Sequence, residues 1–533
     1  MFSSHRPHVI IGLALALLAT PALAADQQPP KWGASIDFEG KLGTERHLGE
    51  ADLFVPLAQD DRTLFFGNAR FRIDDSDSKE GNFGLGLRHM HASGWNGGVY
   101  GYFDRRETTH DNDFNQLTFG AEALGTDFDF RANSYWPIGD TTKNADALST
   151  ATLSGTSVIF RGGEERAFRG FDAEAGWRVP VFQFDSPYDF RVYGGGFHFY
   201  DPDDVAPDVT GPRLRAEFTS YEVPNLTKGT RVTVGAEWQN DDVRGSQAFG
   251  SLRLRIPLQS ENQRNRQLTA QERRMTTPIV RDIDIVAQAG AYGAAETATQ
   301  TASGTTFTVI NSDSTTNLTN AVNALGANST ALLAGSFSTA TTVSLANSKS
   351  LIAGDVTVRA PSGRTAVLSS PAVISSTVVG PTGTIEAPGN NTISGLTINV
   401  TANAANNAYA IVMNTLGDNY NISSNTISVT QGNVGGSSIG IFSDRNDNAV
   451  ISGNIITTRG GVTSRSVATN SSTNITLSGN TFDSSGATTN NNAVVLGGTT
   501  FNAGSTGNVL IAGNCTGTAG SGFIGFTNGT TCQ

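Results

Sequence analysis

The chain has 533 residues and a formal net charge of −12; 16% of its residues are charged and 60 are glycine. This composition argues against a charged helical protein and favours strands joined by tight turns. Seven acidic and six basic residues lie from Thr301 onward, so nearly all of the negative charge belongs to the residues before it. Neither part is basic, so no nucleic-acid partner is expected, and the length allows two or three domains.

Residues 1–24 are predicted to be a secretory signal peptide. The apolar stretch Val9–Ala19 follows a weakly positive start, and the motif Ala22-Leu23-Ala24 is a small-x-small cleavage site. A membrane anchor helix is the alternative interpretation, but a span needs about 20 apolar residues and Pro21 interrupts this run. We therefore expect cleavage between Ala24 and Ala25, which leaves an exported mature chain.

Residues 25–258 are predicted to form a transmembrane β-barrel. Phe128 and Phe130 share one parity of their segment, while Asp129 and Arg131 share the other, so the strand has an apolar face and a charged face. The alternation recurs in segments of about ten residues, the length of a tilted membrane-spanning strand. Twelve strands are expected, near 33–42, 49–57, 62–73, 82–92, 95–105, 114–124, 126–136, 168–180, 188–200, 211–222, 229–239 and 247–257.

A soluble β-sandwich is the alternative, because its strands also alternate. The polar parity here carries Arg, Asp or Glu on nearly every strand, which suits a wet lumen, and Ala and Gly interleave the apolar parity, as a lipid-facing wall permits. Aromatic residues near the strand ends fit the interfacial girdles of a membrane barrel. The residues predicted to face the lumen are Glu122, Arg131, Glu174, Glu217 and Glu237.

Residues 259–290 form a charged segment after the last predicted strand. Gln263–Met275 contains good helix formers, Pro278 is expected to end the helix, and Ile279–Gln288 is expected to be extended. The residue types alone leave two interpretations open: an exposed linker with solvated charges, or a plug inside the pore. In the plug, arginines of this segment would face carboxylates of the lumen such as Glu122, Glu174, Glu217 and Glu237. These arginines are Arg264, Arg266, Arg273, Arg274 and Arg281.

Four motifs stand in order along this part of the chain: NFGLGLRHM (Asn82–Met90), GGVYGYFDRR (Gly97–Arg106), GAEALGTDFDFRANSYWPIGD (Gly120–Asp140) and ERRMTTPIVRDIDIV (Glu272–Val286). They resemble the β-domain of the intimin/invasin family, the inverse autotransporters, and the resemblance covers Lys31–Val286. It implies a 12-stranded barrel in the bacterial outer membrane, a linker threaded through the pore and an extracellular C-terminal passenger. It also implies outer-membrane lipid, the barrel-assembly machinery and periplasmic chaperones as partners.

Residues 291–533 contain Asn-rich repeats. The repeats are NNTISGLTI (Asn390–Ile398), NYNISSNTI (Asn419–Ile427), NAVISGNII (Asn448–Ile456), NITLSGNTF (Asn474–Phe482) and NVLIAGNC (Asn508–Cys515), whose aligned positions Leu396, Asn425, Asn454, Asn480 and Asn514 are 29, 29, 26 and 34 residues apart. Repeats of this length indicate a solenoid. Each holds three short apolar pieces separated by Asn, Gly and Ser turns, which predicts a right-handed parallel β-helix that resembles the pectin-lyase-like superfamily. A helix at Thr316–Leu325 is expected to cap its first coil.

The two cysteines of the chain, Cys515 and Cys532, lie near its C-terminus. In an exported chain an even pair is expected to form a disulfide, with two free thiols as the alternative. The bridged loop would cover the exposed edge of the last coil.

The predicted passenger has no histidine, and its acids are scattered. The one close pair, Asp444 and Asp447, flanks Arg445 and suits a corner turn; whether this pair binds an ion is left open. We therefore expect no enzyme, no cofactor and no metal site. The sequence predicts an outer-membrane anchor and translocator that displays its own β-helix for adhesion to a surface, glycan or host cell, with an unknown receptor. The alternatives are a displayed polysaccharide lyase or hydrolase, and a porin with a periplasmic tail.

Overall fold

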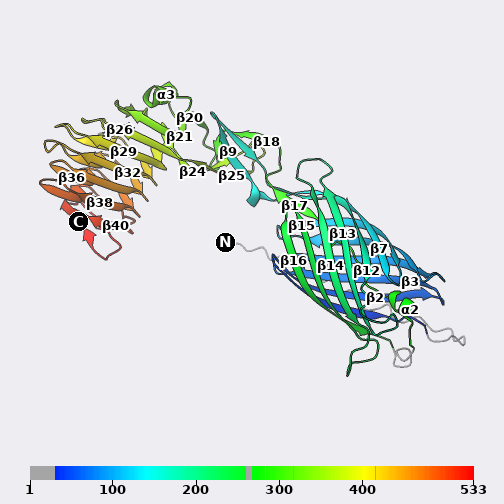
Figure 1. Cartoon of the computed structure of the whole chain (residues 1–533). Coiled ribbons are helices and arrows are strands. Elements are labelled where there is room, and N and C mark those ends of the chain that lie inside the picture. Colours follow the sequence, from blue (N-terminus) through cyan, green and yellow to red (C-terminus); the bar gives the residue numbers. More distant parts are fainter. Residues whose placement is uncertain (1–29, 260–266, 283, 316, 415) are drawn as a thin grey trace. The chain divides into compact units, whose positions relative to one another are not determined.

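The computed structural model describes residues 30–259, 267–282, 284–315, 317–414 and 416–533. The chain divides into two compact units, each of which is built from strands and contains almost no helix (Figure 1). Unit 1 comprises the residues up to Thr141 together with Arg166–Gln288, and unit 2 comprises Thr142–Glu165 together with Ala289–Gln533.

Unit 1 is a closed antiparallel barrel of twelve strands, which confirms the predicted fold of this half. Its order is β1-β16-β15-β14-β13-β12-β7-β6-β5-β4-β3-β2, so each strand pairs with two neighbours. The strands are β1 (Ser35–Gly43), β2 (His47–Gln59), β3 (Thr63–Asp74), β4 (Lys79–Met90), β5 (Asn96–Glu107), β6 (Asp113–Leu124), β7 (Phe128–Ile138), β12 (Arg169–Arg178), β13 (Tyr188–Tyr200), β14 (Val209–Ser220), β15 (Arg231–Asp241) and β16 (Gly245–Pro257).

Side-chain burial on the two parities distinguishes a membrane barrel from a sandwich. Phe119 of β6, Phe130 of β7 and Leu252 of β16 are about half exposed on the outside of the barrel. The alternate positions, such as Thr118 and Asp129, are fully buried inside it. The apolar parity therefore faces outward and the charged parity faces inward, which is the reverse of a soluble sandwich and the arrangement that a lipid-facing wall requires.

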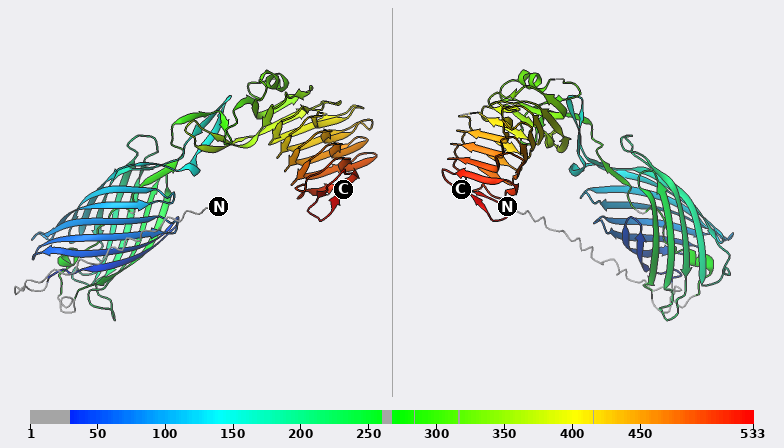
Figure 2. Two further views of the ribbon diagram at one scale, coloured as in Figure 1. Left: turned by 180° about the vertical axis from the view of Figure 1, so that it is seen from behind. Right: turned by 60° about the vertical axis from the view of Figure 1, so that its left-hand side comes forward.

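The larger part of unit 2 is a parallel β-solenoid of about 8 turns, as predicted, and Figure 2 shows its stacked coils from two sides. Three strands of each coil pair with the same strands of the neighbouring coils. The first face holds β23 (Ser350–Ile352), β28 (Thr392–Ser394), β31 (Asn421–Ser423), β34 (Val450–Ser452) and β37 (Thr476–Ser478). The second face holds β21 (Thr330–Thr339), β26 (Ala372–Ser376), β29 (Leu396–Ala402), β32 (Thr426–Gln431), β35 (Ile455–Gly460), β38 (Thr481–Ser485) and β40 (Val509–Ala512).

The third face of the solenoid holds β22 (Val343–Ser344), β27 (Ile385–Ala387), β30 (Ala408–Met413), β33 (Ser438–Asp444), β36 (Thr463–Asn470), β39 (Asn490–Gly497) and β41 (Asn514–Thr518). Equivalent apolar residues stack in register: Ile393 pairs with Ile422, and Ile422 pairs with Ile451. All three are fully buried in one continuous core cluster. The repeat period of the sequence thus becomes the coil period of the structure.

A ladder of buried asparagines runs through the corner between the first and second faces. The Nδ2 atoms of Asn425, Asn454 and Asn480 donate to the Oδ1 atom of the next asparagine, at 3.0, 3.0 and 3.1 Å, and the series ends at Asn508. Each Oδ1 atom also accepts from a backbone N–H of the preceding coil. The buried asparagine side chains therefore have hydrogen-bond partners, and they also accept from backbone N–H groups that a tight turn alone would leave without a partner.

Short elements cover the two ends of the solenoid. Helix α3 (Leu318–Ala324) packs Leu318 and Val322 onto the core beside β20 (Phe307–Asn311), close to the predicted Thr316–Leu325. At the other end β42 (Ile524–Gly525) and β43 (Thr531–Cys532) bring Ile524 and Phe526 against the core. Cys515 and Cys532 are joined there as a disulfide, with their Cα atoms 5.9 Å apart.

The remaining elements are short. They are β8 (Thr142–Asn144), a 3-10 helix at Asp146–Leu148, β9 (Thr150–Ser154), β10 (Ser157–Arg161), β11 (Glu164–Ala167), α2 (Ala270–Arg274), β17 (Ala287–Gly290), β18 (Ala295–Ala298), β19 (Gln300–Thr301), β24 (Gly354–Arg359) and β25 (Thr365–Ser370). Among the described residues, no helix has the length and apolar character needed to span a membrane.

Candidate functional site

The charged interior of the barrel is the candidate functional site. Glu122 of β6 and Arg131 of β7 are direct cross-strand partners, and both are buried. Glu122 accepts from the Nε atom of Arg88 at 2.5 Å, and Arg131 donates through Nη1 to Glu174 of β12 at 2.7 Å. These wall residues form a continuous chain of ion pairs, because opposite charges sit side by side in the strand register.

The other two predicted lumen carboxylates extend the wall network. Arg215 of β14 forms ion pairs with Glu174, at 2.9 Å, and with Glu217. Glu237 of β15 lies 3.4 Å from Nζ of Lys41 and 3.6 Å from Nε of Arg213. All five residues predicted to face the lumen therefore lie on the inner parity.

Arg274 and Arg281 of the linker do face carboxylates of the lumen, but these are not the four carboxylates named from the sequence. Among the described residues, Glu122, Glu174, Glu217 and Glu237 form their ion pairs with basic residues of the barrel wall. The physical reason is the register: neighbouring strands hold opposite charges at the distance of a cross-strand pair before any linker enters. The linker contacts a different set of wall residues.

In the described part of the linker, residues 267–269 are not helical and helix α2 spans Ala270–Arg274, so it does not extend over the whole of the predicted Gln263–Met275. Thr269 is its N-cap and forms a capping box with Glu272. Glu272 also forms a 2.8 Å ion pair with Lys31, and its carbonyl accepts from Nε1 of Trp32 at 2.9 Å. These contacts place α2 at the rim where β1 starts. Pro278 lies beyond the helix, which has already ended at Arg274.

The linker arginines that the structure describes make three different contacts. Arg274 forms an ion pair with buried Asp129 of β7. Arg281 donates through Nη1 to buried Asp104 of β5 at 2.8 Å. Arg273 lies over the ring of Tyr221, with its Cζ atom 4.8 Å from the ring centroid. Arg264 and Arg266 lie outside the described residues, as do Ala24 and Ala25 at the predicted signal cleavage site.

Wall arginines also hold the linker backbone. Arg88 of β4 donates to the carbonyl oxygens of Met275 and Thr277, at 2.8 and 2.7 Å. Arg70 of β3 donates to the carbonyl of Ile279 at 2.9 Å. These charged donors satisfy three backbone carbonyls of the linker, which lowers the cost of burying an irregular segment inside the barrel.

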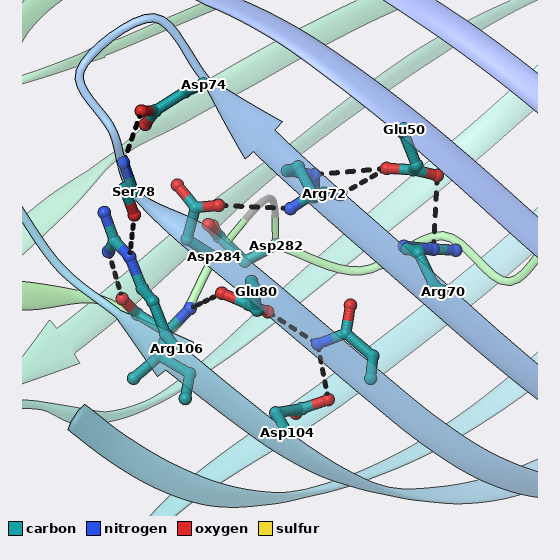
Figure 3. A network of polar contacts seen from close by, with 12 residues as sticks. Glu50, Arg70, Arg72, Asp74, Ser78, Glu80, Asp104, Arg106, Asp282 and Asp284 are labelled. Atoms are coloured by element: carbon teal, nitrogen blue, oxygen red, sulfur yellow. Dashed lines mark hydrogen bonds and ion pairs between the residues drawn. The ribbon is translucent and has the colours of Figure 1, made fainter. Parts of the chain in front are cut away.

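The far end of the linker is held by the acidic residues Asp282 and Asp284. Asp284 accepts from Nη1 of Arg72 at 3.2 Å, and Arg72 in turn donates to Glu50 (Figure 3). Asp282 forms an ion pair with Arg213, and its backbone N–H donates to Oη of Tyr135 at 2.6 Å. The linker therefore carries charges of both signs into a wall that carries both signs.

Ile285 of the linker is held near the turn between β3 and β4. The backbone N–H of Ile285 donates to Glu80 at 2.9 Å, and Nη1 of Arg106 donates to the carbonyl of Ile285 at 2.7 Å (Figure 3). Arg106 also donates to Ser78, which belongs to that turn. This turn is at the end of the barrel opposite to the start of β1. The linker thus runs through the lumen from one rim to the other.

Sequence reasoning missed several residues of this site. They are Glu50, Glu80, Arg88, Asp104, Asp129, Asp282 and Asp284. The strand residues among them all stand on the polar parity, and that parity was the available signal. A polar cavity remains beside the linker, lined mostly by charged residues of β1–β3 and β14–β16.

Asp418 and Asp447 lie at a corner of the solenoid, and Asp444 ends strand β33 just before it. Asp447 is a parallel bridge partner of Asp418 one coil earlier and of Thr473 one coil later. Asp444 accepts from Nδ2 of Asn470 at 2.6 Å, and Arg445 between the two acids has a φ of 51°, as a turn requires. Over the part of the chain that is described, no group of three or more His, Cys, Asp and Glu side chains converges to hold a metal ion.

One tyrosine lies behind this corner. Burial, and secondarily the nearby Asp418 carboxylate, raises the pKa of Tyr420 above its usual value. Its hydroxyl therefore stays protonated and donates to the carbonyl of Ala387 at 3.2 Å. This contact ties adjacent coils together and makes the tyrosine part of the solenoid's structure.

Two features define the class of the first unit: a closed barrel with an apolar outer surface, and an ordered segment through its charged lumen. That class is the membrane-embedded β-barrel. Residues 31–276 match the family model described as "Inverse autotransporter, beta-domain". Residues 31–276 are therefore an inverse autotransporter β-domain, an anchor of the bacterial outer membrane.

Part of the chain is also similar to several solved structures at low sequence identity. One, from work on the in-meso crystallization of membrane proteins, has 15% identity and a TM-score of 0.36, covering 48% of this chain and 99% of that one. The KdgM porin has 9% identity and a TM-score of 0.25, with 41% and 97% covered. The β-domain of the Bordetella autotransporter BrkA has 9% identity and a TM-score of 0.24, with 42% and 98% covered. No curated protein matches the chain. TM-scores this low add nothing to the family match.

Proposed function

We propose that this chain anchors itself in the outer membrane and displays its own β-solenoid on the cell surface, where the solenoid serves adhesion. The observation that carries display is the single pass of the linker through the lumen. An even number of strands returns the chain to the rim where β1 starts, and the linker then crosses once to the other rim. The residues after Gln288 thus continue from the rim opposite to the barrel's N-terminus.

The loops indicate which rim faces outward. The rim where the linker ends carries the connection between β7 and β12, residues 139–168, which is the longest between barrel strands. The rim where the linker begins carries the connections 60–62, 91–95, 125–127, 179–187 and 221–230, none of which is longer than ten residues. Outer-membrane barrels have short periplasmic turns and longer extracellular loops, so the solenoid is expected outside.

Proteolysis of intact cells tests display. A site for a specific protease inserted between Asn528 and Gly529 is expected to be cut on intact cells, because it lies in an exposed turn at the far end of the solenoid. The matched control has the same site inserted in the 224–229 turn of the opposite rim, and it is expected to be cut only after the outer membrane is permeabilised. Cleavage of the Asn528 site only after permeabilisation would refute display.

Adhesion rests on the chemistry of the solenoid surface, which consists mainly of Ser, Thr and Asn side chains that hydrogen-bond to glycans and proteins. Cells carrying the full chain are expected to attach to a glycan array or to host cells better than cells carrying a chain that ends at Gln288. Equal attachment by the two kinds of cell would leave display without adhesion. The porin alternative is not supported, because the linker occupies the lumen.

A further inference from the structure

One segment of the barrel sequence does not fold with the barrel. Residues 142–165 stand between barrel strands β7 and β12 in the chain, but they belong to unit 2. Within them, β9 and β10 form a hairpin, and β10 pairs antiparallel with β18, from Val158 opposite Ala298 to Arg161 opposite Ala295. The result is a three-stranded sheet in which the barrel sequence supplies two strands and the passenger supplies one.

The hairpin also supplies core residues to the passenger. Val158 and Phe160 are 1% and 0% exposed. They belong to a hydrophobic cluster that is separate from the solenoid's main core, and their partners there include Phe307, Val309, Leu332, Val358 and Leu368. A buried aromatic side chain of this kind contributes a large apolar area to the layer where the solenoid starts.

Polar contacts fix the same hairpin to the passenger. Nε of Arg364 donates to Asp146 at 2.7 Å, and Nη2 of Arg364 donates to the carbonyl of Gly163 at 2.5 Å. Nδ2 of Asn311, in the first solenoid strand β20, donates to the carbonyl of Gly155 at the tip of the hairpin, at 3.0 Å. The hairpin is therefore tied at its base and at its tip to residues that follow the linker.

The hairpin precedes the passenger in the sequence, and this order affects how the passenger can fold. Both ends of residues 142–165 continue into barrel strands, so the hairpin is fixed once the barrel closes. The coils of a solenoid contact only their neighbours, so the first coil has no earlier coil to pair with. Non-local strand pairing is slow because loop closure precedes any gain from contacts. If a strand edge is already in place, an incoming strand can pair with it directly, and the slow loop closure is not needed.

We propose that the 142–165 hairpin is a folding template for the passenger: the edge of β10 captures β18 as it leaves the barrel, and the coils then form outward from that sheet. This role goes beyond anchoring and display. It predicts that the hairpin controls how fast the passenger folds, and that coils far from the hairpin keep their own stability once formed.

The test is the rate at which the passenger becomes resistant to protease in pulse-labelled cells carrying the full chain. Phe160→Asp places a charge in the hairpin's buried face and is expected to slow this rate several-fold. Thr152→Asp places the same charge at an exposed position of the same hairpin and is expected to leave the rate unchanged. In the slowed variant, residues 384–533 are expected to reach the resistance of the parent chain in the end.

A second variant tests the same pairing without changing the barrel sequence, so that a defect in barrel assembly cannot explain the result. Ala298→Pro disrupts the passenger's own strand, because proline cannot complete a strand pairing, and it leaves the barrel sequence untouched. It is expected to slow folding as Phe160→Asp does, while the heat-modifiable mobility of the barrel stays unchanged. If both variants fold at the parental rate, with only residues 295–370 left sensitive to protease, the hairpin is a structural cover and the template proposal is wrong. Failure of display would appear differently, since the parent passenger would then be inaccessible on intact cells.

Discussion

A buried ion pair in the lumen adds little net stability, but removing only one of its two partners is strongly destabilising. Arg281 and Asp104 are 3% and 0% exposed at their side chains, and Asp104 also accepts from Thr118 at 2.6 Å and from Asn82 at 2.8 Å. Desolvating such a pair is costly, so the pair adds little net stability, but removing one partner leaves an uncompensated buried charge. The exposed pair of Arg105 and Asp113, at 2.8 Å, has no such penalty.

Arg281→Ala is therefore expected to destabilise unit 1 by about 3–5 kcal/mol, because it leaves Asp104 charged and buried. The same truncation at Arg105 is expected to cost about 0–1 kcal/mol, because its ion pair is exposed to solvent. The measurement is the temperature midpoint of the heat-modifiable gel shift of the detergent-folded chain. Equal midpoints for the two variants would show that the linker is not held in the lumen by this pair.

At the scale of elements, the coils of the solenoid depend on asparagines that stack at one corner. Asn454 is fully buried, donates to Asn480 and to the carbonyl of Ile422, and accepts from Asn425. Removing its amide leaves donors and acceptors on both neighbouring coils without partners, and each unsatisfied buried group costs about 1–3 kcal/mol.

Asn454→Ala is expected to lower the stability of the passenger by about 2–4 kcal/mol, because several such groups lose their partner and the site relaxes in part. Asn399→Ala is the control, since Asn399 is half-buried on the outward side of β29 and is expected to change stability by less than about 0.5 kcal/mol. Pulse proteolysis in urea, following the C-terminal fragment of the detergent-solubilised full chain, measures both. A wild-type midpoint for Asn454→Ala would contradict a stabilising role for the ladder.

The elements that the sequence predicts well are those encoded locally. The alternation of Phe128 and Phe130 with Asp129 and Arg131 identifies a strand without knowledge of its neighbours, and all twelve barrel strands were predicted near their observed positions. The repeat period likewise predicts the coils. Long-range side-chain contacts cannot be predicted in this way. Arg281 pairs with Asp104, which is 177 residues away, and the sequence alone does not distinguish Asp104 from the many other carboxylates on the polar parity. The pairing of β10 with β18 is of the same kind, because nothing within residues 142–165 indicates it.

At the scale of the whole chain, the barrel and the passenger are connected three times. The chain passes between the two units at Thr141 and Thr142, at Glu165 and Arg166, and at Gln288 and Ala289. A single linker would leave passenger folding independent of the barrel, whereas the inserted hairpin gives the barrel sequence two strands and two core residues in the passenger. If the hairpin proposal holds, anchoring and the start of passenger folding both depend on the barrel sequence.

All of this depends on which parity of the barrel meets lipid. Leu252 and Ser251 are neighbours on β16: Leu252 is 57% exposed on the outside, and Ser251 lines the inner cavity. Leu252→Cys and Ser251→Cys, each in a chain with Cys515→Ser and Cys532→Ser, allow a nitroxide to be attached at either position. Oxygen concentrates in hydrocarbon and a nickel chelate stays in water, so their effects on the electron paramagnetic resonance signal distinguish the two environments.

The decisive measurement is the ratio of oxygen to nickel accessibility at these two nitroxides, with the full chain reconstituted in lipid vesicles. We expect a high ratio at residue 252 and a low ratio at residue 251, because adjacent side chains of one strand face lipid and lumen in turn. A nitroxide at residue 252 that the nickel chelate reaches as readily as it reaches residue 251 would contradict the account.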